Sequence, residues 1–428
     1  MNEQVAEVAA QARRELSGRV LAATLRSVRD LDIAEESTAD AFLLALQSWP
    51  TAGIPASVEA WLITAARRRA VDRIRRAQVA RRSLITLRGG WSGVVAGSDV
   101  VANAALVGDD ELRMVVLCCD PRLPPQDQVA LTLRLVCGIS TAGIAAVHGI
   151  PTSTMAARLT RAKARLAAAG PMLDLPDDAT VDARLPAVAR VVYLAFTLGH
   201  TATQGAELMD DDLADHAQYL AAVLRALRPA SASFAALLAL IVLTRARSGG
   251  RFDDDDDQLT LPAADRFRWD RTSIRAGVSL LTGFVDRVDA DPLVLQAAIA
   301  AEHSTASSFE TTNWLRLTQL YARLLELDPS PGFALGRCIA VSYAAGPAAG
   351  LADLDEVLRL GGLDRYPYAS AARAQMLERL NRVADAVPEW SQAAALARTT
   401  AEREFFQANA DRCSSYQEQT KRPERSGK

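Results

Sequence analysis

Two segments within the first 170 residues constrain this chain most. The first runs from Ala66 to Arg82 and is rich in arginine. The second runs from Ile139 to Leu166 and has the pattern of two short helices joined by a turn at Gly149 and Ile150. Both patterns are helical, and both place basic residues where nucleic acid can be contacted. Their order within one N-terminal block therefore limits both the fold and the function of the chain.

The arginine-rich segment predicts a helix that meets phosphate. It contains a single acid, Asp72. On a helix, Arg69, Arg73 and Arg76 share one face because they are spaced i, i+4, i+7. Such a stripe suits neutralisation of a nucleic-acid backbone, although a solvated basic face gives the same pattern. The candidate DNA-binding residues are Arg67, Arg68, Arg69, Arg73, Arg75 and Arg76.

The second segment reads as a helix-turn-helix, with a scaffold helix from Thr141 to His148 and a second helix opening at Pro151 or Thr152. Recognition helices present their N-terminal residues to base edges in the major groove. The candidates for base contact are Thr152, Ser153, Thr154 and Arg158. The candidates for phosphate contact are Arg161, Lys163 and Arg165. Ala156, Leu159 and Leu166 are expected to face the core. A helical hairpin that only packs is the alternative.

The rest of the chain predicts an all-α protein. Helical spacing of apolar residues covers 5–29, 32–48 and the segment that begins at Ser57, with a break at 49–55. Beyond Pro171, helix follows helix. Near the end, segments of about a dozen residues recur in pairs roughly 34 residues apart, which resembles tetratricopeptide repeats. The expected domains are 10–85, a linker at 86–109, 110–170, and a helical extension at 176–416.

Charge divides the chain in the same place. Residues 1–170 hold 21 basic and 16 acidic residues, a balance of +5, whereas residues 171–428 hold 27 basic and 35 acidic residues, a balance of −8. The first part can therefore meet phosphate, and the second should not. No apolar run is long enough for a membrane span, and no signal peptide is apparent, so we expect a cytoplasmic protein that does not contact the membrane.

Five cysteines contain no CxxC pair, which predicts buried thiols and neither a disulfide nor a zinc site. No catalytic constellation, cofactor motif or metal site is apparent, so the chain is not expected to be an enzyme. Five consecutive acids, Asp253–Asp257, lack the oxygen spacing of a calcium loop. A solvated loop is one interpretation of this run. An electrostatic latch onto the arginine-rich helix is the other.

Several short motifs together resemble the extracytoplasmic-function (ECF) sigma factors of the sigma-70 superfamily. Over about residues 10–170 they are Ala34-Glu35-Glu36, Asp40-Ala41-Phe42, Trp61-Leu62 with the arginines, Leu123-Pro124-Pro125, and Thr154 through Leu166. Further motifs are similar to the subgroup with a long C-terminal helical extension: Asp109 through Arg113, Cys118-Cys119-Asp120-Pro121, Arg184 through Val188, Tyr193 through Phe196, and Arg268-Trp269-Asp270.

This resemblance implies a non-catalytic protein that directs RNA polymerase to promoters. Its partners would be the core polymerase, through the β′ and β subunits, and promoter DNA. The arginine-rich helix would hold the minus-ten strand, and the helix from Thr152 would read the minus-thirty-five duplex. The candidate polymerase contacts are Glu35, Glu36, Asp40 and Phe42. The extension would regulate activity, holding either the chain's own N-terminal domains or a partner protein.

Two other interpretations remain open at this stage. A stand-alone helix-turn-helix regulator with a repeat-like interaction domain would bind duplex DNA without polymerase. A repeat scaffold would need neither. The acidic segment ahead of the arginines favours a sigma factor, because a simple repressor has no use for a polymerase-binding helix there.

Overall fold

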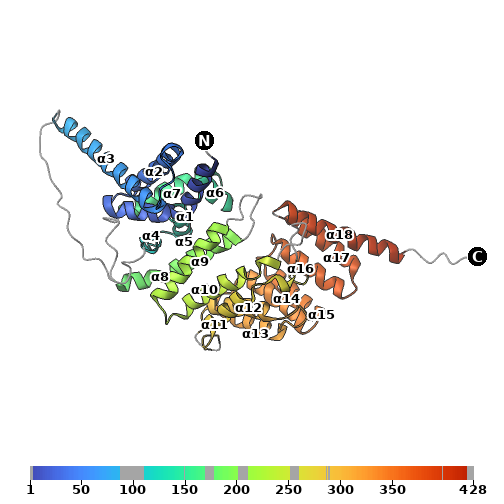
Figure 1. The fold of residues 1–428 in the computed structure, drawn as a ribbon. Helices are drawn as coiled ribbons and strands as arrows, with labels where there is room; N and C mark the ends of the chain where they lie inside the picture. Colours follow the sequence, from blue (N-terminus) through green and yellow to red (C-terminus); the bar gives the residue numbers. More distant parts are fainter. Residues whose placement is uncertain are drawn as a thin grey trace, which may run out of the picture. The chain divides into compact units, whose positions relative to one another are not determined.

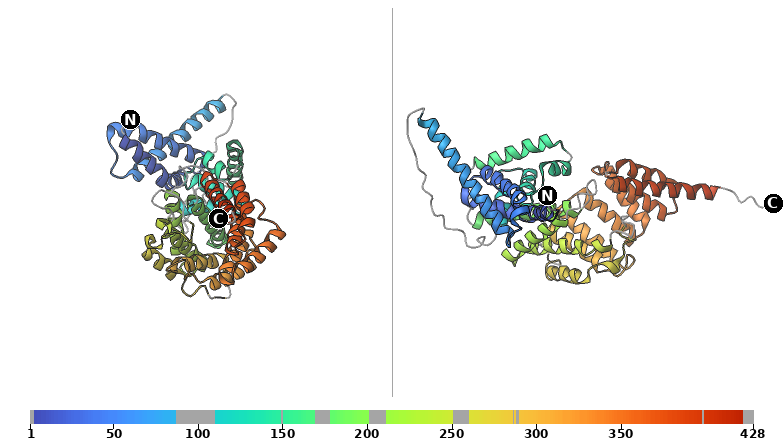
Figure 2. Two further views of the ribbon diagram at one scale, coloured as in Figure 1. Left: turned by 90° about the vertical axis from the view of Figure 1, so that its right-hand side faces the viewer. Right: turned by 45° about the horizontal axis from the view of Figure 1, so that its top comes forward.

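The computed structural model describes residues 3–86, 110–148, 150–168, 178–200, 211–250, 260–285, 287, 290–397 and 399–421. Every regular element within these ranges is a helix, which confirms the all-α prediction. The chain divides into two compact units. Unit 1 comprises Met1–Thr201 and Met209–Leu227, and unit 2 comprises Ala202–Leu208 and Arg228–Lys428. Figures 1 and 2 show the helices of each unit.

Unit 1 begins with a three-helix bundle in which α1 packs against both of the others. Its helices are α1 (Glu3–Val28), α2 (Leu31–Ala52) and α3 (Val58–Thr86). Phe42, Trp49 and Leu62 are buried in the core of this bundle, and the Trp49 and Trp61 rings meet edge to face at 5.4 Å. Beyond this core, α3 extends well past its two neighbours (Figures 1 and 2).

Local sequence explains where these helices start and stop. The Asp30 side chain caps α2 by accepting a hydrogen bond from the Ile33 amide at 3.0 Å. The Ser57 hydroxyl accepts one from the Ala60 amide at the start of α3. The break predicted at 49–55 comes later, because α2 continues through Pro50 to Ala52. Gly53, whose φ of 84° suits glycine, caps its C-terminus.

Four short helices form the second bundle of unit 1. They are α4 (Asp110–Cys118), α5 (Pro125–Leu135), α6 (Thr141–Val147) and α7 (Thr152–Ala167). Ser140 caps α6 through a hydrogen bond from the Gly143 amide. On α7 the buried residues are Met155, Leu159, Ala162 and Leu166. The expectation for Ala156 was wrong: it is exposed, and Met155 takes the core position one residue earlier.

The first two helices of the C-terminal extension belong to unit 1 as well. These are α8 (Asp178–His200) and α9 (Asp211–Leu227), which pack against each other. Helix α8 also contacts α4 and α5, and α9 contacts α1. The segment expected as one extension, 176–416, is thus divided between the two units.

Unit 2 is a succession of helices in which each packs mainly on the next. Its α-helices are α10 (Ala232–Arg245), α11 (Arg271–Leu281), α12 (Pro292–Thr305), α13 (Trp314–Leu327), α14 (Pro331–Ala344), α15 (Pro347–Leu360), α16 (Pro367–Arg379), α17 (Val383–Leu396) and α18 (Thr400–Lys421). Two short 3-10 helices, η2 (Ser248–Gly250) and η3 (Arg266–Arg268), follow α10.

From α13 onward the helix starts recur at the predicted interval. Trp314 and Pro347 begin alternate helices 33 residues apart, and Pro331 and Pro367 begin alternate helices 36 residues apart. Helices of this length that stack on their neighbours bury a continuous core, here built around Trp390, Leu377 and Leu354. The five helices from α13 to α17 are each 13 or 14 residues long, close to the dozen residues expected for the recurring segments.

Helix α10 is the most apolar element. Together with the turn that follows it, Ala232–Gly250 is long and apolar enough to cross a membrane, but half of it is buried inside the protein. It packs against α11 and α12, so it serves as a core helix of unit 2. Three sequence features fall outside the described residues: the linker at 87–109, Gly149 of the turn, and the acidic run Asp253–Asp257.

Candidate nucleic-acid interface

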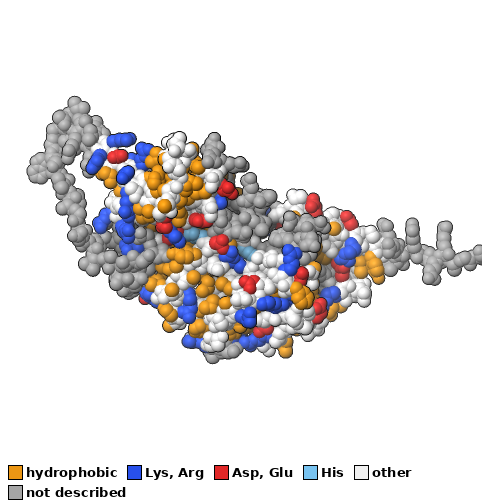
Figure 3. Space-filling model, in the orientation of Figure 1, with side chains coloured by type: hydrophobic (Ala, Val, Ile, Leu, Met, Phe, Trp, Pro, Cys, Tyr) orange, Lys and Arg blue, Asp and Glu red, His pale blue; other side chains and the backbone are white. Residues whose placement is uncertain are grey.

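The arginines of α3 divide into two groups by what they contact. Arg68, Arg75 and Arg76 are exposed, and Arg69 is half-buried. None of these four has an acidic partner among the residues that the structure describes. The basic side chains follow the helix where it extends from the bundle (Figure 3). A row of unpaired guanidinium groups on an exposed helix is an electrostatic site for phosphate.

The remaining two arginines face inward. Arg73 lies 2.8 Å from both the Glu36 and the Asp40 carboxylates of α2, so it joins α3 to α2. Arg67 donates a hydrogen bond to the Ala23 carbonyl of α1 at 3.4 Å. Arg69, Arg73 and Arg76 follow one another at the predicted helical spacing on α3. Tertiary packing nevertheless pairs Arg73 with the Glu36 and Asp40 carboxylates of α2.

Helix α2 presents an acidic face with an apolar residue beside it. Glu36, Asp40 and Leu43 lie on one face by helical spacing, and the Leu43 side chain is 57% exposed. Phe42, expected as a partner contact, is instead buried in the bundle core, with 8% of its surface exposed. Sequence reasoning missed Leu43. The available signal was its position: Leu43 directly follows Phe42 and lies off the buried face that Ala41 and Ala45 define at i, i+4 spacing.

Helix α7 begins with hydroxyl side chains that point to solvent. Thr152, Ser153 and Thr154 are all exposed, and no side chain caps the helix start at Pro151. Free amide groups and hydroxyls at a helix N-terminus are donors for phosphate and base edges. This end of α7 is therefore open to solvent, as a recognition surface requires.

The basic residues further along α7 are partly engaged within the protein. Arg158 and Arg165 lie 3.8 and 3.5 Å from the Asp127 carboxylate of α5, whereas Arg161 is exposed. Burial and the nearby Arg158 charge lower the pKa of His148 at the end of α6, which favours the neutral imidazole.

Lys163 joins the two bundles of unit 1. Its Nζ lies 3.0 Å from Oε2 of Glu35 and 3.2 Å from Oδ1 of Asp32, both on α2. Partial burial acts to lower the pKa of Lys163, but the hydrogen bonds to Glu35 and Asp32 raise it above its ordinary value. The other Glu35 oxygen, Oε1, lies 3.0 Å from Arg134 of α5. Glu35, expected to face a partner, is thus held by two cations of the same chain.

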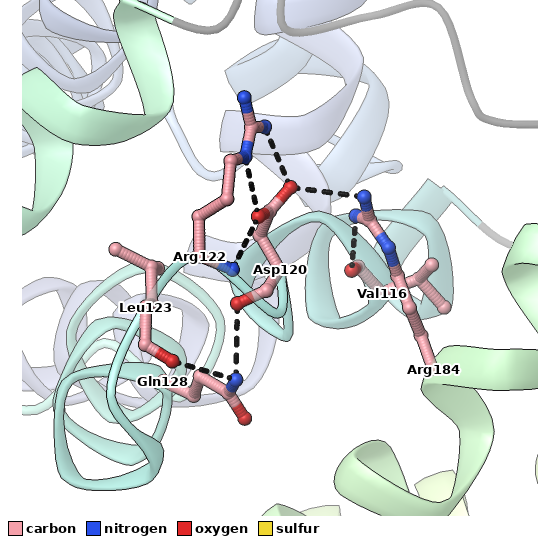
Figure 4. A network of polar contacts seen from close by, with 6 residues as sticks. All are labelled: Val116, Asp120, Arg122, Leu123, Gln128 and Arg184. Carbon is pink, nitrogen blue, oxygen red and sulfur yellow. Dashed lines mark hydrogen bonds and ion pairs between the residues drawn. The ribbon is translucent and has the colours of Figure 1, made fainter.

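A buried carboxylate connects the second bundle to α8 (Figure 4). Asp120, whose side chain is 3% exposed, accepts hydrogen bonds from Arg122 Nε at 2.7 Å and from Arg184 at 2.9 Å. The hydrogen bonds from Arg122 hold the pKa of Asp120 at about 2, and Arg184 contributes to this depression. Arg184 also donates to the Val116 carbonyl, and Gln128 closes the turn through the Asp120 and Leu123 carbonyls.

A second buried carboxylate, Glu111, lies where three parts of unit 1 meet. Its fully buried side chain lies 3.5 Å from Arg19 of α1 and 3.2 Å from His216 of α9. Partial burial opposes ionisation of Arg19, but Glu111 raises its pKa above the ordinary value. Buried charges require partners of this kind. Glu111 and Asp120 both belong to the short motifs that distinguished the subgroup.

The cysteines and acids build no metal site in the described part of the chain: no group of three His, Cys, Asp or Glu side chains is placed to hold an ion there. All five thiols are free, and four of them are buried. Burial raises the pKa of Cys118 to about 12. Such thiols are structural rather than reactive.

Comparison with known proteins adds three family matches. The chain matches Sigma-70 region 2 over residues 13–79, which covers the second part of α1, all of α2 and most of α3. It matches Sigma-70 region 4 over residues 113–166, which covers α4 to α7. A third match, over residues 184–284, is to a family of unknown function, DUF6596, and runs from α8 into unit 2.

Similar proteins include an ECF sigma factor. An uncharacterized protein of Rhizobium meliloti (strain 1021) is 35% identical over 395 residues, covering 91% of this chain and 92% of that protein. The ECF RNA polymerase sigma factor SigK of Mycobacterium ulcerans (strain Agy99) is 36% identical over 145 residues, covering 33% of this chain and 74% of SigK. The crystal structure of yeast Tom70 covers 97% of this chain and 86% of Tom70, with 13% identity and a TM-score of 0.37, too low to support an argument.

The sigma regions match in the order, and at the helices, that the sequence motifs indicated. The chain therefore belongs to the ECF sigma factors of the sigma-70 superfamily, in the group that carries a long C-terminal helical extension.

Proposed function

We propose that this sigma factor acts in the cytoplasm, docks on the β′ subunit of core RNA polymerase through α2, holds the minus-ten strand on α3 and reads the minus-thirty-five duplex with α7. The observation that carries this proposal is the pairing of two surfaces in one unit: four arginines of α3 without acidic partners among the described residues, and an exposed hydroxyl start of α7.

The polymerase contact is assigned to Glu36, Asp40 and Leu43 with Glu35 beside them. Acidic residues around an exposed leucine form a surface that suits a basic, partly apolar partner and repels DNA. Phe42 supports this surface from below, because it is buried in the core under it. Arg73 fixes the positions of the Glu36 and Asp40 carboxylates from the other side.

The DNA contacts are assigned by exposure. Arg68, Arg75 and Arg76 have their guanidinium groups free for the minus-ten strand, and Arg69 lies at the edge of this row. On α7, Thr152, Ser153 and Thr154 are placed for base edges, and Arg161 for the flanking phosphates. Arg158, Arg165 and Lys163 have to exchange their carboxylate partners for phosphate to join them.

Unit 2 is assigned a regulatory role, supported by its connection to the sigma domains. The extension begins with α8 and α9, which contact α1, α4 and α5 in unit 1. This pair of helices is thus the part of the extension that contacts the sigma regions, and the chain continues from it into the helical repeats of unit 2. The acidic balance of residues 171–428 argues against DNA as a partner of the extension.

The test is transcription of fragmented genomic DNA by core polymerase of the host bacterium, with and without the full chain. The 5′ ends of the transcripts are mapped by sequencing. We expect start sites that depend on the protein and share motifs at minus ten and minus thirty-five. The triple variant Arg68→Ala, Arg75→Ala, Arg76→Ala should abolish these starts, whereas Arg359→Ala and Arg382→Ala in unit 2 remove exposed arginines as a matched control.

Absence of any protein-dependent start, together with failure to bind core polymerase, would contradict the proposal. If the full chain still bound duplex DNA in that case, a stand-alone regulator would replace the sigma mechanism. In a stand-alone regulator, α7 alone would supply the affinity for duplex DNA, and the arginines of α3 would need another role.

A further inference from the structure

Four aromatic rings from different parts of the chain meet on the surface of unit 2. The Trp314 ring, at the start of α13, stacks on the Tyr343 ring near the end of α14, with the ring centroids 4.5 Å apart. Phe309 meets these two rings edge to face at 4.9 and 5.0 Å, and His303 of α12 meets Trp314 at 5.6 Å. All four residues are half-buried. Aromatic side chains already held in one geometry can bind a partner with little further loss of conformational entropy.

Arg379, at the end of α16, places a positive charge on these rings. Its guanidinium lies 4.1 Å from the centroid of the Tyr343 ring, and it donates hydrogen bonds to the Ser342 hydroxyl and carbonyl oxygens at 3.1 and 2.8 Å. Within the described part of the chain, no carboxylate pairs with Arg379, whereas Arg337 of α14 and Arg373 of α16 both have one. Arg379 is therefore a fixed, exposed cation whose remaining N–H groups can bind a carboxylate.

A second arginine, Arg266 of η3, adds positive charge beside the same rings. It is only 5% exposed, and it donates hydrogen bonds to the His303 and Ala306 carbonyls at 3.0 and 2.9 Å. These acceptors are neutral, and burial together with the nearby Arg271 lowers the pKa of Arg266. Burial and the charges of Arg247 and Arg266 also lower the pKa of His303 to about 3, which keeps the imidazole neutral. The rings therefore lie in a region of positive potential.

We propose that this surface binds an acidic protein segment that carries an aromatic or large aliphatic side chain. Tryptophan, tyrosine and arginine supply most of the binding energy at protein interfaces, and carboxylates complement the charge of Arg379. The exposed carboxylate of Glu310 offsets only part of the charge of Arg266. The surface, which we name the aromatic edge, comprises His303, Phe309, Trp314, Tyr343 and Arg379.

A protein segment fits the aromatic edge better than nucleic acid does. Rings and arginines can also bind single strands, but residues 171–428 carry a balance of −8, which opposes a polyanion. The inference deepens the regulatory role proposed for unit 2 by giving the chemistry of its partner. It rests on that role only for its effect on transcription, because binding itself is measured without polymerase.

Fluorescence anisotropy with the full-length protein tests the chemistry of the partner. The probe is a fluorescein-labelled peptide in which phenylalanine and leucine alternate with aspartate. Three comparison peptides replace the aspartates by asparagine, the aspartates by lysine, or the phenylalanines and leucines by serine. We expect the acidic probe to bind at least about tenfold more tightly than each of the three, because each lacks the charge or the apolar anchor that the edge complements.

Variants of the aromatic edge test its position. Arg379→Gln should weaken binding of the acidic probe at least about tenfold, because it removes the cation. Tyr343→Leu should also weaken it, whereas Tyr343→Phe keeps the ring and should bind as the wild type does. Arg359→Gln is the matched control, because Arg359 is exposed and pairs with Glu356 on its own helix, α15. Arg379 is itself exposed, so its variants keep the test valid even if Tyr343→Leu fails to fold.

Carbodiimide coupling locates the bound probe. The variant Arg379→Lys keeps the positive charge and supplies an amine. The reagent activates an aspartate of the probe, and the amine displaces it to form an amide as the reagent leaves as a urea. We expect the probe to be joined at position 379, and we expect Arg359→Lys, with its amine outside the edge, to give at least about tenfold less product at position 359. The chain's own lysines are Lys163, Lys421 and Lys428, so the new product is simple to map.

Three results would overturn the inference. The first is an acidic probe that binds no more tightly than the asparagine peptide, and the second is an equal loss of affinity in Arg379→Gln and Arg359→Gln. The third is a fluorescein-labelled oligothymidylate that binds more tightly than the probe and loses affinity in Arg379→Gln, which would make nucleic acid the partner. Failure of the proposed function looks different, because it is seen as absence of core binding and of protein-dependent starts, and the peptide measurements contain no polymerase.

Discussion

Arg184 of α8 donates a hydrogen bond to Asp120 of region 4 at 2.9 Å, across 64 positions of sequence. The carboxylate is almost fully buried, and Arg184 itself is only 12% exposed. The contact joins the extension to the sigma domains at the C-terminal end of α4. The C-terminal extension is therefore attached to region 4 by a buried ion pair before the chain enters unit 2.

Replacement of Arg184 by Ala should loosen this junction. Asp120 keeps Arg122 as a partner but loses one buried charge-assisted hydrogen bond, which is worth about 1–3 kcal/mol. Hydrogen exchange of amides in α4 and α5 should become about tenfold faster at neutral pH. Arg190→Ala, an exposed arginine on the same helix, is the matched control and should leave exchange unchanged. Equal effects of the two variants would show that the ion pair has no special role.

Truncation should give different results on the two sides of the α8 and α9 pair. A fragment that ends at Gly170 loses Arg184 and His216, so Asp120 and Glu111 each lose one buried partner. A fragment that ends at Leu227 retains both partners. We expect the longer fragment to be monomeric and cooperative in thermal unfolding, and the shorter one to melt at least about 2–4 °C lower, as loss of 1 kcal/mol or more implies. Size-exclusion chromatography and circular dichroism measure both properties, and equal melting temperatures would contradict the assignment of α8 and α9 to unit 1.

Much of this fold was predictable because helical periodicity and capping residues are local signals. Ser57 begins its helix where the sequence placed it, and helix starts recur in unit 2 at close to the predicted interval. The partners of the charged residues were not predictable, because Arg73 with Glu36 and Lys163 with Glu35 depend on tertiary packing. Phe42 shows the same limit: periodicity could not tell a core phenylalanine from the exposed Leu43 beside it.

The Asp120 junction should also depend on pH in the acid range. Its pKa falls from 3.8 to about 2 in the folded protein, chiefly through the hydrogen bonds from Arg122. A carboxyl whose pKa is lower in the folded protein than in the unfolded chain stabilises the fold at pH values above its unfolded pKa. This contribution, about 2 kcal/mol, is lost as the pH falls from about 4 to about 2. The stability difference between wild type and Asp120→Asn should therefore be constant above pH 5 and shrink below pH 4. A difference that grew on acidification would show that the carboxylate is not held in its charged form.

The thiols should divide by burial in a labelling experiment. Burial raises the pKa of Cys118 to about 12 and that of Cys338 to about 11, and it also raises the pKa of Cys119. At pH 8 these groups are neutral thiols, and the thiolate is the reactive form. With a disulfide reagent, the half-buried Cys137 should react first, in the native protein. The other four thiols should react only in denaturant. Rapid reaction of two or more thiols in the native protein would contradict the buried placement of the others.

Arg73 and Arg75 should behave differently although they are two positions apart on the same helix. Arg75 is exposed and has no acidic partner in the described part of the chain, so Arg75→Ala should weaken promoter binding by the holoenzyme and reduce its salt dependence by nearly one unit of slope. Arg73 is held by Glu36 and Asp40 in a half-exposed pair, so Arg73→Ala should leave that slope unchanged. It should instead cost about 0.5–1 kcal/mol of stability, as removal of a partly exposed ion pair does. Promoter affinity measured from 50 to 300 mM salt (about 14 to 6 Å of Debye screening length from the low to the high end) separates the two, and equal slopes would show that Arg73 leaves its carboxylates to bind DNA.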